Sequence, residues 1–133
     1  MEPLEKPPPT LLVVEDEHLI RSGVADFLRE CGWRVLEAAS AAEAIEILES
    51  GAPIELVFSD IQMPGAMDGF GLGRWVREHR PGVRVILTSG VIGASDAATA
   101  LCDEGPIAKP YDYQHLAERI RHHLGAGIGP ALA

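Results

Sequence analysis

The sequence predicts an α/β protein in which a five-stranded parallel sheet carries helices on both faces, a (βα)5 sandwich of three layers. Two observations favour this fold. Short apolar runs alternate five times with segments whose apolar residues recur at helical spacing, a pattern typical of a parallel sheet. A glycine follows each helical segment, where a helix is expected to end. The chain has 133 residues, enough for one domain with a core and too few for two ordinary ones.

The strands are expected where apolar runs are rich in β-branched residues. Continuous runs, rather than alternating ones, indicate strands that are buried on both faces. The third of these runs leads directly to Asp60, and a turn at Pro64-Gly65 follows closely. The predicted strands cover residues 11–14, 33–38, 54–58, 83–87 and 107–108.

The helices are expected between the strands. Ser40 and Glu43 have capping-box spacing at the start of the second helix, and Asp112 is placed to cap the last. One face of the first helix is apolar and consists of Ile20, Val24, Phe27, Leu28 and Cys31. The predicted helices cover residues 20–31, 41–50, 72–79, 95–104 and 112–124, and the fourth is the least periodic.

The ends of the chain differ in composition from its centre. Residues 1–9 contain three consecutive prolines and predict a disordered lead-in. Residues 10–125 form the expected domain, and residues 126–133 are a Gly- and Ala-rich flexible tail. Because only nine residues follow Leu124, we expect no separate output domain in this chain.

Composition and charge exclude several classes of function. The net charge is −9, which argues against general binding of nucleic acid. No apolar run is long enough to cross a membrane. Cys31 and Cys102 fit no metal-binding spacing and are interpreted as buried free thiols, so we expect a cytoplasmic protein.

Polar residues end four of the predicted strands. Glu15 and Asp16 follow the first strand, Asp60 the third, Thr88 the fourth and Lys109 the fifth. In an open parallel sheet, ligands bind beyond the carboxyl ends of the strands, at the point where the strand order reverses. In the flavodoxin-like order 2-1-3-4-5 that point lies between strands one and three. We therefore expect these five side chains to form one site.

The residue types at this site suit phosphoryl transfer. Three neighbouring carboxylates repel one another and favour the binding of a cation. An oxygen-rich site without His or Cys favours Mg²⁺. Asp60 is placed to attack a phosphoryl group and form an aspartyl phosphate. The Lys109 ammonium would offset charge on the transferring group, and the Thr88 hydroxyl would donate to a phosphoryl oxygen.

At these residues the chain resembles the receiver domain of two-component response regulators, the CheY-like superfamily. The resemblance runs from about Thr10 to Leu124. The motifs that carry it are Glu15-Asp16, Asp60 with Met63-Pro64-Gly65, Met67-Asp68-Gly69, Leu87-Thr88-Ser89-Gly90 and Lys109-Pro110.

The resemblance implies a function, a metal and partners. A histidine kinase or histidine phosphotransfer protein would phosphorylate Asp60 in the presence of Mg²⁺. Asp16 and Asp60 would ligate the metal directly, Glu15 largely through water, and Gln62 through its backbone carbonyl. The chain would not be an enzyme but a phosphoacceptor that assists its own phosphorylation and dephosphorylation. It would act as a monomer or weak homodimer, through contacts with an unknown output protein or as a phosphate sink.

One position departs from the pattern of the resemblance. Receivers usually carry an aromatic residue three positions before the lysine, and that side chain swings inward when the hydroxyl residue moves. Here the position is Pro106. A proline has no such rotamer and no N–H to donate to a strand. The resemblance therefore implies an atypical switch.

Three alternatives compete with a stand-alone receiver. The chain could be the receiver of a hybrid histidine kinase. It could be a phosphohydrolase of the haloacid-dehalogenase type, but that family has a second acid two residues after the nucleophile, where this chain has Gln62. It could also be a degenerate receiver that only binds partners, a reading that the full set of polar site residues disfavours.

Overall fold

The parallel sheet predicted from the sequence is present in the structure, a computed structural model that describes residues 8–89, 107–108 and 112–124. Its five strands lie in the order β2-β1-β3-β4-β5, which confirms the predicted order. Every neighbouring pair is parallel. The strands are β1 (Thr10–Val14), β2 (Arg34–Ala38), β3 (Ile54–Asp60), β4 (Arg84–Ser89) and β5 (Ile107–Ala108).

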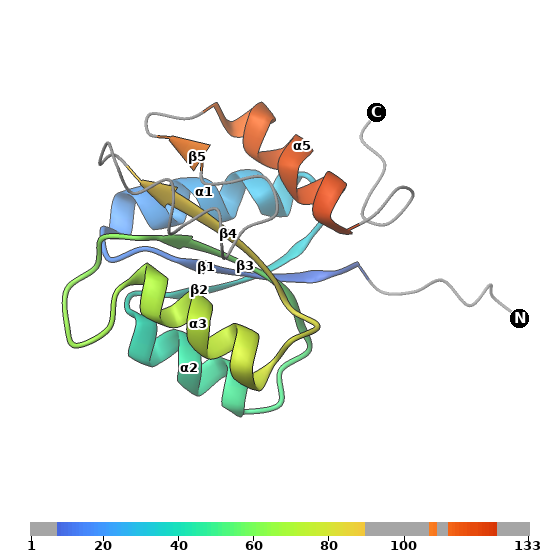
Figure 1. Cartoon of the computed structure of the whole chain (residues 1–133). Coiled ribbons are helices and arrows are strands. Elements are labelled where there is room, and N and C mark those ends of the chain that lie inside the picture. Colours follow the sequence, from blue (N-terminus) through green and yellow to red (C-terminus); the bar gives the residue numbers. More distant parts are fainter. Residues whose placement is uncertain (1–7, 90–106, 109–111, 125–133) are drawn as a thin grey trace, which may run out of the picture.

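Helices cover both faces of this sheet, as expected. In Figure 1, α2 and α3 lie below the sheet and α1 and α5 lie above it. The predicted helix at residues 95–104 lies outside the described residues. The described helices are α1 (His18–Glu30), α2 (Ala41–Glu49), α3 (Gly69–His79) and α5 (Tyr113–Leu124).

Strand β1, which lies between β2 and β3, contributes side chains to both halves of the core because they alternate between the faces of the sheet. Leu11 and Val13 pack with α1 and α5, whereas Leu12 and Val14 pack with α2 and α3. All four are at most 1% exposed, as expected for a strand covered on both sides. The continuous apolar run in the sequence therefore reflects burial on both faces.

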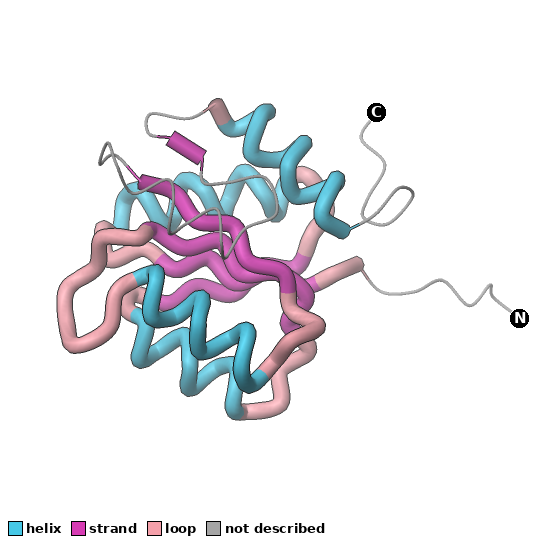
Figure 2. Tube along the Cα trace, in the orientation of Figure 1, coloured by secondary structure: helices cyan, strands magenta, loops and turns pink. Residues whose placement is uncertain are grey.

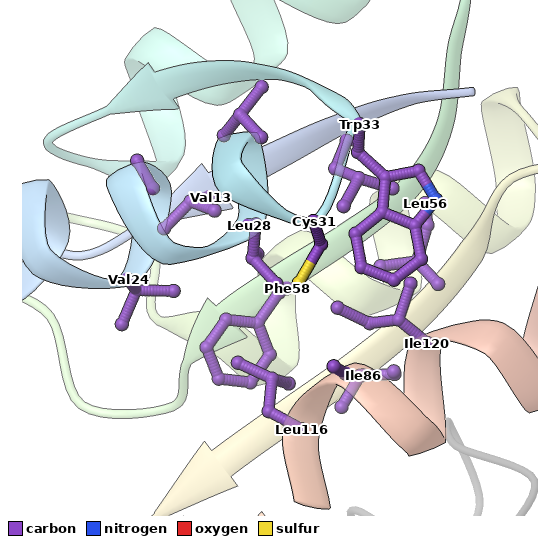
Figure 3. Close-up of a cluster of buried hydrophobic side chains, with 14 of the residues drawn as sticks. Val13, Val24, Leu28, Cys31, Trp33, Leu56, Phe58, Ile86, Leu116 and Ile120 are labelled. Carbon is purple, nitrogen blue, oxygen red and sulfur yellow. The ribbon is translucent and has the colours of Figure 1, made fainter. Parts of the chain in front are cut away.

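Figure 3 shows the half of the core beneath α1 and α5. Trp33 and Cys31 lie together at the carboxyl end of α1, and Ile120 of α5 belongs to the same buried cluster. Cys31 is buried and free, as the sequence predicts. Burial raises the pKa of the Cys31 thiol above its ordinary value, although the Arg121 guanidinium opposes that effect.

Local signals end and begin the helices as expected. The Ser40 hydroxyl accepts a hydrogen bond from the Glu43 backbone N–H at 3.1 Å. The Glu43 carboxylate accepts from the N–H of Ala39, at 2.8 Å, so the capping box closes one residue before the cap. Gly32 and Gly51 follow α1 and α2 with φ of 104° and 89°, a conformation that favours glycine.

Some boundaries and one apolar face differ from the prediction. β3 continues to Asp60 and β4 to Ser89, so the polar residues that end the apolar runs still belong to the strands. Ile20, predicted to face inward, is 38% exposed. Ile20 belongs to the first turn of α1, where its neighbour Leu19 is 83% exposed, so this turn is less covered than the rest of the helix.

The loops at one edge of the sheet join each strand to the next helix. All strands run in the same direction, so their carboxyl ends lie together at this edge. Figure 2 shows there the long loop that connects β3 to α3. None of the helices in the described part of the chain is long and apolar enough to span a membrane.

Candidate functional site

Three carboxylates meet at the carboxyl edge of the sheet. Glu15 and Asp16 follow β1, and Asp60 is the last residue of the adjacent strand β3. One carboxylate oxygen from each of the three lies within 4.8 Å of the others. Glu15 and Asp60 are 6% and 5% exposed, whereas Asp16 is open to solvent. The three residues define the acidic pocket, which the sequence predicts at this point of strand reversal.

Backbone hydrogen bonds hold Glu15 in the pocket. Its N–H donates to the carbonyl of Ala38 at 3.1 Å, which continues the pairing of β1 with β2. Its carboxylate oxygen Oε2 accepts from the N–H of Glu17 at 3.0 Å. The first bond fixes the backbone of Glu15 and the second fixes its side chain, so the carboxylate has a defined direction.

Asp60 is oriented by the residues that follow it. Its Oδ1 accepts a hydrogen bond from the Gln62 backbone N–H at 3.1 Å. The Ser59 hydroxyl donates to the Asp60 carbonyl at 2.9 Å. Because one oxygen is held by a backbone N–H, the carboxylate cannot rotate freely about its last bond.

Thr88 lies next to Asp60 on the neighbouring strand. The two residues are register partners in the parallel pairing of β3 with β4. Thr88 is 1% exposed, and its carbonyl accepts from the N–H of Ile61 at 2.9 Å. Side chains of register partners lie on the same face of a sheet. The hydroxyl of Thr88 is therefore a neighbour of the Asp60 carboxylate, as the sequence predicts.

The loop after Asp60 ends at Gly69, which lies against the end of β3. The first residue of α3, Gly69, donates its N–H to the carbonyl of Ile61 at 2.8 Å. A Cβ atom at Gly69 would lie 2.4 Å from the carbonyl oxygen of Asp60 and 2.6 Å from the Cα of Ile61. Only glycine allows this approach. Asp68 caps α3, because its side chain accepts from the N–H of Gly71 at 3.0 Å.

The donor set of the acidic pocket fits Mg²⁺. Its ligand atoms are all carboxylate oxygens, and a hard cation that prefers oxygen suits such a set. The exposed carboxylate of Asp16 leaves one side of the pocket open, which suits an ion that retains several water ligands.

The structure brings together four of the residues predicted for the site, Glu15, Asp16, Asp60 and Thr88. The metal role of the Gln62 carbonyl stays a prediction, since the structure shows only its N–H bonded to Asp60. Lys109 and Pro106 lie outside the described residues.

Sequence reasoning missed Arg21 and Gly69 as residues that shape the site. The Arg21 guanidinium donates from Nη1 to the Glu15 carbonyl at 2.9 Å. A single arginine on a helix belongs to no periodic pattern that would mark it in the sequence. Gly69 is part of the Met67-Asp68-Gly69 motif in the sequence, but its close contact with Asp60 is visible only after folding.

A family model matches this chain, and curated proteins resemble it, among them the three that follow. The model of the response regulator receiver domain matches residues 11–121. The chain is 37% identical to the sensor kinase CckA of Brucella abortus over 86% of its length. It is 33% identical to the transcriptional regulatory protein YvrH of Bacillus subtilis and 35% identical to AruR of Pseudomonas aeruginosa, over 86% and 92% of its length. It spans only 12%, 48% and 54% of these three proteins.

Solved structures of receiver domains have the same fold as this chain. A CheY-like receiver domain protein of Methanospirillum hungatei has a TM-score of 0.78 at 26% identity, over 86% of this chain and 92% of that one. TrrA of Thermotoga maritima, solved in complex with Mg(2+)-BeF, has a TM-score of 0.78 at 26% identity, over 87% and 99%. The chain therefore belongs to the response regulator receiver domain family and has the phosphoreceiver function of two-component signalling.

Proposed function

We propose that Asp60 accepts a phosphoryl group from the phosphohistidine of a histidine kinase or a histidine phosphotransfer protein. The observation that carries this proposal is the position of Asp60, a buried carboxylate at the end of β3 with oxygens of Glu15 and Asp16 within 4.8 Å. In this role the chain is a phosphoacceptor and does not turn over a separate substrate.

The chemical step is a displacement at phosphorus. A carboxylate oxygen of Asp60 forms the new P–O bond while the P–N bond to the donor histidine breaks, and the leaving imidazole takes up a proton. The hydrogen bond from the Gln62 N–H to Oδ1 holds the carboxylate in one orientation during the attack.

The metal of this reaction would be Mg²⁺ in the acidic pocket. Asp16 and Asp60 would bind it directly, Glu15 largely through water, and Gln62 through its backbone carbonyl. When bound, Mg²⁺ supplies positive charge that offsets the negative charge of the phosphoryl oxygens. The bond from the Glu17 N–H keeps the Glu15 carboxylate in position for this role.

Two further residues complete the proposed site. Thr88, the register partner of Asp60, would donate its hydroxyl to a phosphoryl oxygen. Lys109, which follows β5 in the sequence, would contribute its ammonium. Because Pro106 stands where receivers usually have an aromatic residue, we propose that movement of Thr88 is read out through another part of the surface.

The partners follow from the same proposal. Curated relatives include a sensor kinase and transcriptional regulators, so the receiver of a hybrid kinase is not better supported than that of a response regulator. The phosphorylated chain would contact an unknown output protein or drain phosphoryl groups, as a monomer or weak homodimer. It would act in the cytoplasm, where kinases obtain their phosphoryl groups from ATP.

The proposal is tested by incubation with acetyl phosphate and Mg²⁺, followed by intact mass spectrometry. We expect one phosphoryl adduct on the wild-type chain and none on Asp60→Asn. Asp68→Asn is the matched control, because it neutralises another acid of the same loop, outside the acidic pocket, and keeps a residue that caps helices well. It should accept the phosphoryl group as the wild type does.

Three outcomes would contradict the proposal. An adduct that persists in Asp60→Asn would place the phosphoacceptor elsewhere. Repeated turnover of a small phosphoester such as p-nitrophenyl phosphate would indicate a phosphohydrolase instead of a receiver. If no adduct forms with either acetyl phosphate or a phosphorylated histidine kinase, the chain is a receiver that only binds partners.

A further inference from the structure

The turn that carries Glu15 and Asp16 is tied to the neighbouring strand β2 through Arg21. The Arg21 guanidinium donates from Nη1 to the Glu15 carbonyl at 2.9 Å. Its Nε lies 3.2 Å from Oε1 of Glu37 on β2. The two side chains are 15% and 26% exposed, so water shields this ion pair less than a pair on the open surface.

Glu37 is itself held by a second arginine of α1. Its other oxygen, Oε2, lies 3.1 Å from Nη2 of Arg29. The same nitrogen donates to the Val35 carbonyl at 2.8 Å. Glu37 therefore binds one arginine through each carboxylate oxygen, and its Oε1 is directed toward Arg21.

The backbone of Glu15 is linked to two consecutive residues of β2, once directly and once through the Arg21 side chain. The N–H of Glu15 donates directly to Ala38, at 3.1 Å. The carbonyl of Glu15 reaches Glu37 through Arg21. The peptide groups on both sides of the Glu15 Cα are thus held, and these groups set the direction in which the carboxylates of Glu15 and Asp16 leave the turn.

We propose that Arg21, oriented by Glu37, is a positioning residue of the acidic pocket and holds the Glu15–Asp16 turn in the geometry that receives Mg²⁺. This inference rests on the proposed function of the pocket. Partners that orient metal ligands typically change metal affinity 10- to 100-fold when they are removed.

Charge alone makes a different prediction from positioning. The Arg21 guanidinium is a cation and repels Mg²⁺, so removing its charge would strengthen metal binding if electrostatics were its only effect. A substitution that keeps the charge separates the two roles. Lysine keeps the charge, but its single ammonium cannot span the acceptors that the flat guanidinium bridges, namely the Glu15 carbonyl, Glu37 and the Nδ1 of His18.

The test compares Arg21→Lys with Arg29→Lys by isothermal titration calorimetry with MgCl₂ alone. Both arginines belong to α1 and bind Glu37, but of the two only Arg21 donates to the Glu15 carbonyl. We expect the Kd for Mg²⁺ to rise about 10-fold in Arg21→Lys and by less than about 2-fold in Arg29→Lys, because a lysine at position 29 still supplies a cation to Oε2 of Glu37. Circular dichroism confirms that each variant is folded.

A second variant tests the same inference if Arg21→Lys fails to fold. Glu37→Gln keeps Arg21 but removes the carboxylate that orients it, and we expect a similar rise in Kd. This titration is performed at high KCl, which screens the loss of the Glu37 charge.

The inference is overturned if Arg21→Lys binds Mg²⁺ with the wild-type Kd, because the guanidinium would then contribute only charge or stability. Equal weakening in Arg29→Lys would also overturn it, because the effect would then belong to the stability of α1. If the wild-type chain binds no Mg²⁺, the proposed metal site fails together with this inference. If the wild type is phosphorylated on Asp60 but Arg21→Lys binds Mg²⁺ with the wild-type Kd, the proposed function stands and only the role of Arg21 is refuted.

Discussion

At the scale of single residues, the site depends on a close approach of two backbone segments. The start of α3 comes so near to the end of β3 that an added Cβ at Gly69 would lie 2.4 Å from the Asp60 carbonyl oxygen. The neighbouring atoms belong to the backbone of Asp60 and Ile61 at the end of β3, which cannot move aside as a flexible side chain does. Gly69 therefore sets where the residue that follows Asp60 turns away from the sheet.

We predict that Gly69→Ala lowers the free energy of unfolding by about 1–3 kcal/mol, as overpacking does in other cores. The small gain in helix propensity from alanine is outweighed by the clash. Urea denaturation measures the change. Because the clash displaces the Asp60 backbone, the variant should also accept phosphoryl groups from acetyl phosphate more slowly.

Gly82→Ala is the control for Gly69→Ala. An added Cβ at Gly82 meets no atom within 4 Å, so stability should change by less than about 0.5 kcal/mol. A Gly69→Ala protein with wild-type stability and a wild-type rate of phosphorylation would show that the loop relaxes without cost.

At the scale of elements, the helices were predictable where a local signal begins or ends them. Ser40 and Glu43 start α2, and Gly32 and Gly51 end α1 and α2, as the sequence predicts. Such signals act within one turn of chain, so they do not depend on the rest of the fold. The inward face of α1 was less predictable at Ile20, which is 38% exposed in the first turn of that helix.

We predict that Ser40→Ala lowers the free energy of unfolding by about 1 kcal/mol, because the Glu43 N–H loses its acceptor. Thermal or urea denaturation measures the difference. Ser50→Ala at the other end of α2 is the matched control. The Ser50 hydroxyl donates to the Ile47 carbonyl in an exposed hydrogen bond, and water can replace it as the donor. The free energy of unfolding should therefore change by less than about 0.5 kcal/mol. Equal effects in both variants would argue against a specific role of the cap.

At the scale of the whole molecule, the acidic pocket couples metal binding to stability. Three carboxylates with oxygens within 4.8 Å repel one another, and the chain already carries a net charge of −9. A bound cation would relieve this repulsion. Without a cation, the repulsion among these carboxylates lowers the free energy of unfolding, and the packing of the rest of the sheet outweighs this loss.

We predict that Asp60→Asn raises the melting temperature in the absence of Mg²⁺ and reduces the stabilisation that Mg²⁺ gives. In EDTA the variant should melt a few degrees above the wild type, because one of the three charges is gone. Mg²⁺ at ten times its Kd should stabilise the wild type by about 1.4 kcal/mol. It should stabilise Asp60→Asn much less. Differential scanning calorimetry measures both. A variant that melts below the wild type in EDTA would show that Asp60 contributes more through its hydrogen bonds than it costs by repulsion.

The fold and most of the described site could be predicted from the chain alone. Continuous apolar runs identify strands that are buried on both faces, and helical periods between them imply a parallel sheet. The direction of parallel strands then brings the residues that end them to one edge. Glu15, Asp16, Asp60 and Thr88 were found in this way, although they are far apart in the sequence.

Only the tertiary structure showed what holds that site in place. The bond from Arg21 to the Glu15 carbonyl and the contact of Gly69 with Asp60 join residues by distance and direction, which no period in the sequence records. Hydrophobic periodicity reports which face of an element is buried, because burial repeats along the element. A single polar contact or a single missing Cβ does not repeat, so its role appears only when the chain is folded.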